Sequence, residues 1–352
     1  MAATLGAYMS ELHKFLFEGL PVRGMLVRLT DSWREVLKRR EAGGAYPVEV
    51  RALLGEMAAA GCLMQSNIKF NGALILQVFG DGPVKLAVAE VQPDLSFRAT
   101  AKVVGDVPTG ARLEAMLNLH GQGRCAITLA PKDALPGQQP YQGVVPLHGD
   151  QREPLQKLSQ VLEHYMLQSE QLDTRLILAA NDDIAAGLLI QRLPMQGAGN
   201  LGGRLGAGPS QAEPSPLGGQ PVTPAWGRTS SDEEVIGLNE DYNRIAHLAA
   251  TLTSAELLTL DADTILRRLF WEESLRRFEP AQPRFACTCS RERVTNMLQS
   301  LGQAEVDSII SERGEVEVGC EFCGVQYRFD PVDVGEMFTD AHKQAPGSAT
   351  VQ

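Results

Sequence analysis

Three features are scarce or missing in this chain of 352 residues: long apolar runs, positive charge, and cysteines spread along the sequence. No run of about 18 uninterrupted apolar residues is present, so the sequence offers no segment that would span a bilayer as a helix. The N-terminal residues do not combine a basic stretch with an apolar run, so we expect no signal peptide. We therefore predict a soluble protein of the cytoplasm.

The shortage of positive charge argues against nucleic acid and membranes as partners. Lys and Arg number 32 against 43 Asp and Glu, which gives a formal net charge of −11. Phosphate backbones and anionic membrane surfaces bind basic protein surfaces. Residues 281–330 contain 5 Arg, no Lys and 8 acidic residues. A zinc ribbon that binds DNA or RNA would be basic. We therefore expect neither a nucleic acid nor a membrane as a partner.

The six cysteines are not arranged as in a disulfide-stapled secreted protein, which would spread them through a short chain. Four of them form two close pairs, Cys287 with Cys289 and Cys320 with Cys323, separated by 30 residues. The second pair is a CxxC followed by Gly324, and two such pairs have the ligand spacing of a four-thiolate zinc site. We therefore predict that these four cysteines bind one zinc ion per chain.

The first pair is unusual because only one residue separates its cysteines. A disulfide within such a pair closes a very small ring, and off-ideal geometry makes a disulfide easier to reduce. The pair therefore suits reversible oxidation. Spacing alone leaves two alternatives open: a structural zinc site in an interaction protein without a redox role, and a thioredoxin-like dithiol at Cys320 and Cys323, for which no βαβ pattern is present.

Other polar and sulfur residues carry weaker signals. Arg291 and Arg293 could offset part of the negative charge of four thiolates on zinc, or could be solvated. Cys62 and Cys125 are expected to be buried small apolar residues. Residues 197–202 match GxGxxG, but Gly and Pro continue beyond the motif, so no helix can begin there to hold a pyrophosphate.

The order of the periodic segments predicts an α+β fold. The strands are grouped first and a packed helix follows them, which differs from a repeating βαβ pattern. Residues 196–231 hold 9 Gly and 5 Pro, a composition typical of a disordered segment. Short amphipathic helices follow, with apolar residues that include Ile245, Leu266 and Phe270, and such helices need a packing partner. The predicted parts are an N-terminal α/β core domain at 1–195, a disordered insertion at 196–235, a metastable helical linker at 236–284, a zinc-binding redox-switch module at 285–335 and a flexible tail at 336–352.

The chain resembles the heat shock protein 33 family of redox-regulated bacterial chaperonins. The cysteine signature of that family appears here as CTCSRER from Cys287 and CEFCG from Cys320. Further similar segments are residues 15–24, 80–88, 141–145, 165–175, 248–253 and 256–260. The Gly- and Pro-rich stretch is longer than the resemblance leads us to expect.

The resemblance implies a holdase chaperone rather than an enzyme, one that binds unfolding proteins and prevents their aggregation under oxidative stress. The reduced form would hold zinc through all four cysteines and be inactive. Oxidation would form disulfides Cys287–Cys289 and Cys320–Cys323 and release zinc. The module and the linker would then lose structure, apolar surface would be exposed, and homodimers would form.

Overall fold

The computed structural model of the protein describes residues 9–41, 44–133, 139–193 and 239–339. The chain divides into two compact units. The first contains Met1–Leu37 and Tyr46–Phe285, and the second contains Lys38–Ala45 and Ala286–Gln352. The insertion and most of the tail predicted from the sequence, together with the GxGxxG match, lie outside the described residues.

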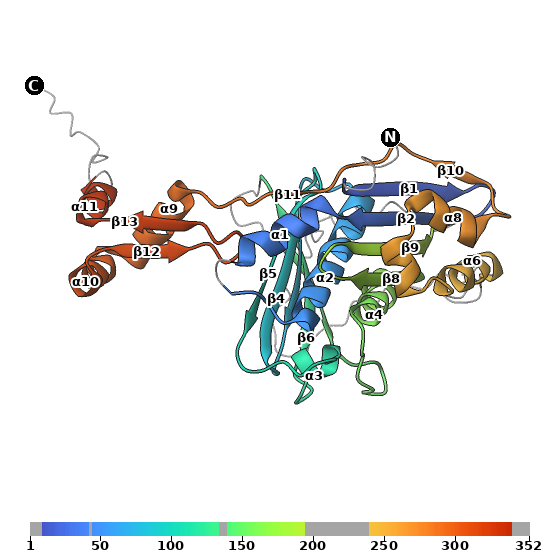
Figure 1. The fold of residues 1–352 in the computed structure, drawn as a ribbon, viewed down its shortest axis with the longest axis horizontal. Helices are drawn as coiled ribbons and strands as arrows, with labels where there is room; N and C mark the ends of the chain where they lie inside the picture. Colours follow the sequence, from blue (N-terminus) through green and yellow to red (C-terminus); the bar gives the residue numbers. More distant parts are fainter. Residues whose placement is uncertain (1–8, 42–43, 134–138, 194–238, 340–352) are drawn as a thin grey trace, which may run out of the picture. The chain divides into compact units, whose positions relative to one another are not determined.

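Two sheets form the framework of the first unit (Figure 1). The five-stranded sheet has the order β10-β1-β2-β9-β8, and every neighbouring pair is antiparallel. Its strands are β1 (Glu11–Phe17), β2 (Val22–Leu29), β8 (Thr174–Ala180), β9 (Ala185–Arg192) and β10 (Leu275–Arg277). The six-stranded sheet has the order β11-β5-β4-β3-β6-β7. Its strands are β3 (Gly72–Phe79), β4 (Val84–Val91), β5 (Ser96–Val103), β6 (Arg124–Pro131), β7 (Tyr141–Pro146) and β11 (Arg284–Phe285).

Helix α2 (Val48–Asn67) lies between the two sheets and contacts strands of both (Figure 1). Thirteen of its residues are buried, because a helix enclosed by sheets needs apolar or small side chains all round rather than one apolar stripe. Gly55 allows the closest approach, since a Cβ there would come within 2.5 Å of the Ala180 Cβ. Cys62 is buried as predicted, and Met57 and Met64 of the same helix are buried too. The other helices in the described residues before 194 are α1 (Asp31–Glu41), α3 (Leu113–Leu117) and α4 (Leu158–Glu170).

Helices α6 (Glu240–Ala250), α7 (Ser254–Thr259) and α8 (Ala262–Phe270) cover the face of the five-stranded sheet that points away from α2 (Figure 1). Phe270 is the clearest anchor, because its ring lies 5.0 Å from that of Phe17 and 6.2 Å from that of Phe15. Ile245 and Leu266 are also buried in this interface. The amphipathic faces predicted from the sequence therefore have a partner, which is an antiparallel sheet that is apolar on both sides.

The ends of these helices follow their sequence signals. Thr253 and Glu256 form a capping box, in which each side chain accepts a hydrogen bond from the backbone N–H of the other residue. Asp261 caps α8 by accepting a hydrogen bond from the Thr264 N–H. These local bonds fix where each short helix begins, while burial against the sheet supplies the stability that such short helices lack alone.

The linker is helical only as far as Phe270, which differs from the fully helical segment predicted for 236–284. Residues after it form β10, which adds to the edge strand β1, and β11, which pairs with the edge strand β5 in parallel. Pro280 and Pro283 account for the last part of the difference, because proline cannot continue a helix and favours extended backbone in the residue before it. The segment 275–285 therefore runs along the edges of both sheets.

In the second unit, the periodicity of the sequence predicts helices at 291–301 and 304–312 and a hairpin of strands at 315–318 and 325–329, with the second cysteine pair in its turn. These elements are present, together with a last helix that was not predicted. They are α9 (Arg291–Leu301), α10 (Gln303–Arg313), β12 (Val316–Gly319), β13 (Gln326–Phe329) and α11 (Pro331–Thr339). The strands pair as an antiparallel hairpin. Six apolar residues are buried in its core: Leu298, Val306, Val316, Phe329, Val334 and Met337. Helix α11 continues through residue 336, where we expected a flexible tail to begin, because Val334 and Met337 belong to this core.

The predicted α+β class is confirmed by the two sheets and their packed helices. Strands β1 and β2 and helix α1 were not predicted, although β2 and β9 form the centre of the five-stranded sheet. None of the helices in the described part of the chain has the length and apolar character needed to span a bilayer.

Adjacent residues in and after α8 test how much its packing contributes to stability. Phe270 is 2% exposed and Trp271 is 74% exposed. We expect Phe270→Ala to lower the free energy of unfolding by about 3–5 kcal/mol, because it leaves a cavity between α8 and the sheet. We expect Trp271→Ala to change it by less than about 0.5 kcal/mol. Denaturant unfolding, with hydrogen exchange of the α8 amides, measures both, and equal effects of the two changes would contradict this packing.

Candidate metal centre

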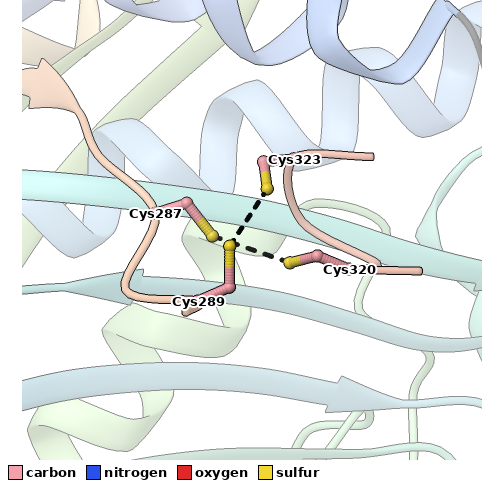
Figure 2. Close-up of side chains that lie close together, drawn as sticks. All are labelled: Cys287, Cys289, Cys320 and Cys323. Atoms are coloured by element: carbon pink, nitrogen blue, oxygen red, sulfur yellow. Dashed lines mark hydrogen bonds between the residues drawn. The ribbon is translucent and has the colours of Figure 1, made fainter. Parts of the chain in front are cut away.

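Four cysteine sulfurs from two separate chain segments meet in the second unit (Figure 2). Cys287 and Cys289 lie in the extended segment before α9, and Cys320 and Cys323 lie in the turn between β12 and β13. The hairpin places the second pair, as predicted. Ser290 accepts a hydrogen bond from the Arg293 N–H and so fixes the start of α9 directly after the first pair.

The sulfur positions fit a tetrahedral metal site. All four Sγ atoms lie within 4.8 Å of one another. The contacts join the two pairs, with 3.6 Å between the sulfurs of Cys287 and Cys320 and 3.3 Å between those of Cys289 and Cys323 (Figure 2). A tetrahedron of thiolates at the usual Zn–S distance has edges of about 3.8 Å. The sulfur positions are thus compatible with one zinc ion, and within the described residues no disulfide joins any of the four cysteines.

Backbone donors in the turn point at the sulfurs of the second pair. The N–H groups of Phe322 and Cys323 donate to the Cys320 sulfur, and the Val325 N–H donates to the Cys323 sulfur. Gly324 makes this turn with φ of +71°, a conformation that glycine adopts without strain. Donors of this kind stabilise thiolates on a metal and orient them. The CxxC-Gly motif therefore supplies both ligands and their hydrogen-bond donors.

Burial disfavours thiolates at this site unless a cation is present. It raises the pKa of the Cys320 and Cys323 thiols, against the opposite effect of the backbone N–H donors. Four thiolates within 4.8 Å would also repel one another. A bound Zn²⁺ removes both penalties by replacing the thiol protons. The donor set therefore fits a soft divalent metal better than it fits four free thiolates.

Tyr327 is a contributor that the sequence did not identify. Its hydroxyl donates a hydrogen bond to the Cys289 sulfur at 3.2 Å, and this bond raises the pKa of the Tyr327 phenol to about 12. Strand β13 was predicted correctly, but nothing in a strand pattern indicates which of its residues reaches a sulfur. Tyr327 lies opposite Val318 in the hairpin, and only the pairing register brings it near Cys289.

The two arginines after the first cysteine pair differ in their contacts and exposure. Arg291 donates to the Arg328 carbonyl at 2.7 Å, pairs with Asp333 at 2.8 Å and lies 4.2 Å over the ring of Phe329. It therefore links α9 to β13 and α11. Arg293 is exposed on α9.

The remaining cysteines are confirmed as buried apolar residues. Cys62 and Cys125 are fully buried in the first unit. Burial raises the pKa of the Cys125 thiol to about 12 and that of Cys62 further. Both thiols are therefore protonated at neutral pH, which makes them poor nucleophiles and poor metal ligands.

Comparison with known proteins identifies the family. The profile named Hsp33 protein matches residues 10–330. The chain belongs to the Hsp33 protein family. The resemblance seen in the sequence is thereby confirmed, and it extends over both units of the structure.

Named relatives support the same assignment. The 33 kDa chaperonin of Chromobacterium violaceum is 43% identical over 93% of both chains. The 33 kDa chaperonin of Methylobacillus flagellatus is 39% identical over 93% of this chain and 94% of its own length. The crystal structure of the 33 kDa chaperonin (heat shock protein 33 homolog) of Thermotoga maritima has the same fold, with a TM-score of 0.68 at 18% identity, over 95% of this chain and 99% of that chain.

Replacing Tyr327 tests its contribution to the metal centre of this Hsp33 family member. We expect Tyr327→Phe to weaken zinc binding by the reduced protein about tenfold, because partners of metal ligands typically contribute 10- to 100-fold to affinity. Competition with a chromophoric chelator measures the affinity. Tyr141→Phe, which removes a hydroxyl from a strand of the first unit, is the matched control. Unchanged affinity in Tyr327→Phe would show that the hydrogen bond to Cys289 does not support the metal.

Proposed function

We propose that the protein is a chaperone of the holdase type whose activity is switched on by oxidation. In the reduced state Cys287, Cys289, Cys320 and Cys323 bind one zinc ion and the protein is inactive. Oxidation of the four thiols releases zinc and activates the binding of unfolding proteins. The observation that carries the proposal is the convergence of four cysteine sulfurs from two segments within 4.8 Å, together with membership of the Hsp33 protein family.

Metal binding and the order of the second unit depend on each other in this proposal. Among the described residues, the core of the unit contains six buried apolar residues, which is too few for much independent stability. Structural zinc contributes roughly 10–16 kcal/mol to the folding of small zinc modules. Removing the four thiolates therefore removes the main source of order in the cysteine module.

Oxidation requires a change of sulfur partners. In the reduced geometry the nearest sulfurs belong to different pairs, as expected where both pairs bind one metal ion. We propose that oxidation instead joins Cys287 to Cys289 and Cys320 to Cys323. Formation of each disulfide takes two electrons from two thiols, and with hypochlorous acid as oxidant the other products are one chloride, one proton and one water. Zinc leaves because a disulfide sulfur is not a thiolate ligand.

The apolar face between the linker helices and the five-stranded sheet is the candidate client surface. It contains Phe15, Phe17 and Ile190 on the sheet side and Ile245 and Phe270 on the helix side. The helices are attached to the cysteine module through β10 and β11, which pair over only three and two residues. Loss of order after Phe285 would weaken this attachment. Released helices would expose apolar surface of the size that binds other proteins, including a second copy of the chain.

The proposed activity is binding rather than catalysis, in a reducing compartment that keeps the thiols free. Two other functions predict different results. A zinc-stabilised interaction protein would lose fold when its cysteines are replaced, but oxidant would not create an activity. A disulfide oxidoreductase would turn over in an insulin-reduction assay.

The central test compares the reduced, zinc-loaded protein with the protein after treatment with hypochlorous acid. We expect only the oxidised protein to suppress light scattering by a thermally unfolding client, and we expect it to have released its zinc. Sedimentation measurements should show dimers in the oxidised sample alone, because newly exposed apolar surface favours self-association. Equal suppression by the reduced form would exclude a redox switch.

Matched cysteine variants connect the effect to the metal centre. Cys62→Ser alters a buried thiol outside the centre and should leave activation by oxidant intact. Cys289→Ser removes one ligand and one half of a proposed disulfide, so the reduced variant should bind zinc at least tenfold more weakly and lose oxidant control. Normal oxidant control in Cys289→Ser would contradict the assignment of this residue.

A further inference from the structure

A cavity of about 520 Å³ lies in the first unit, away from the cysteines. Strands β1 and β2 and the C-terminal end of α2 form three of its walls. Leu95, in the turn between β4 and β5, and Phe278, between β10 and β11, line the others. The volume is in the range of pockets that hold small organic molecules.

Two basic side chains line this cavity. Lys14 on β1 and Arg23 on β2 are both half-buried. Lys14 Nζ donates to the carbonyl of Ser66 at 2.5 Å, and Arg23 donates through Nε and Nη2 to Gln191 Oε1 at 3.1 and 2.5 Å. Within the described residues, neither cation forms an ion pair with a carboxylate. Lys69, which is exposed, adds a third positive charge to the lining.

The electrostatics of the two cations are unfavourable without a further anion. Burial lowers the pKa of Arg23 to about 10. Burial and the nearby charge of Arg23 lower the pKa of Lys14. Two like charges in partly dehydrated surroundings repel each other and lose hydration. A neutral carbonyl and a neutral amide, the acceptors that the fold provides, do not cancel this charge.

The position of Arg23 is fixed by a chain of amides. Gln191 is fully buried, and its Nε2 donates to Thr174 Oγ1 at 2.9 Å. Its Oε1 also accepts from Asn67 Nδ2 at 2.9 Å. These bonds orient the amide so that its oxygen faces Arg23. Within the described residues, Nη1 of Arg23 has no hydrogen-bond acceptor. Gln191 therefore holds the guanidinium in place while the N–H groups of Nη1 can donate to a ligand.

We propose that this cavity binds a small organic anion, with a phosphate or carboxylate group between Lys14 and Arg23. The apolar body of the ligand would lie against Ile68, Leu95 and Phe278, which line the same cavity. The two cations supply charge-assisted hydrogen bonds, and the apolar wall supplies burial. The site is independent of the metal centre, and its binding does not require the proposed chaperone function.

Calorimetric titration of the reduced, metal-loaded full chain at low ionic strength tests the site. The probes are phenyl phosphate, 3-phenylpropionate, inorganic phosphate and neutral benzyl alcohol. At least one of the organic anions should bind about tenfold more tightly than benzyl alcohol, since each charge-assisted hydrogen bond contributes that much or more. The stronger of the two identifies phosphate or carboxylate as the preferred group. Failure of both to bind, or equal binding of inorganic phosphate and phenyl phosphate, would overturn the proposal.

Charge variants locate the binding. Arg23→Gln should weaken binding of the preferred anion about tenfold. Lys69→Gln, an exposed change that leaves the fold intact, should weaken it about two- to threefold. Lys102→Gln removes one charge from an exposed position on β5 and should have no effect. Equal losses in all three variants would indicate nonspecific attraction and contradict the site.

Hydrogen exchange gives a readout that does not depend on any variant. The Phe278 N–H donates to the Lys14 carbonyl at 3.0 Å, and the Ala281 N–H donates to the Leu12 carbonyl at 2.9 Å. An anion held in the cavity should slow exchange of these two amides, because it stabilises the wall that they attach to β1. Amides of β7 should not change. Protection that misses Phe278 and Ala281 would place the ligand elsewhere.

Discussion

The apolar outer face of the five-stranded sheet is the constraint on which the arrangement of the first unit depends. Phe15, Phe17 and Ile190 point away from α2 and would meet water if nothing covered them. Helices α6 to α8 cover them, although these helices are distant in sequence from every strand except β10. The linker is thus part of the core of the first unit, and its removal would expose a ready-made apolar surface.

The order of the cysteine module rests on its sulfur chemistry rather than on the size of its core. Its own core is small, and its four sulfurs meet only because an extended segment and a hairpin turn lie side by side. A metal ion holds such an arrangement together far more strongly than the few apolar contacts do. In the function that we propose, the order of the module depends on the oxidation state of its sulfurs, and the short pairings of β10 and β11 connect that order to the linker.

The first unit also contains a charge arrangement that neither the metal centre nor the linker explains. Lys14 and Arg23 lie on the α2 side of the sheet, opposite to the face covered by the linker helices. The fold fixes them with neutral acceptors and leaves their charge without a counter-ion among the described residues. A partly buried charge without a counter-ion lowers stability, and proteins commonly retain one where a ligand supplies the opposite charge. The same sheet would then carry a covered apolar face on one side and an anion site on the other.

Local signals in the sequence determined much of this structure. The spacing of Cys287, Cys289, Cys320 and Cys323 indicated one metal centre, and the caps at Thr253 and Asp261 set the starts of two helices, because both depend on neighbours in the chain. Tertiary packing alone decided the rest. Three features depend on sheet register and on unpaired strand edges. They are the approach of Tyr327 to Cys289, the meeting of Lys14 with Arg23 and the strand pairing of 275–285. No periodicity in the sequence encodes those two properties.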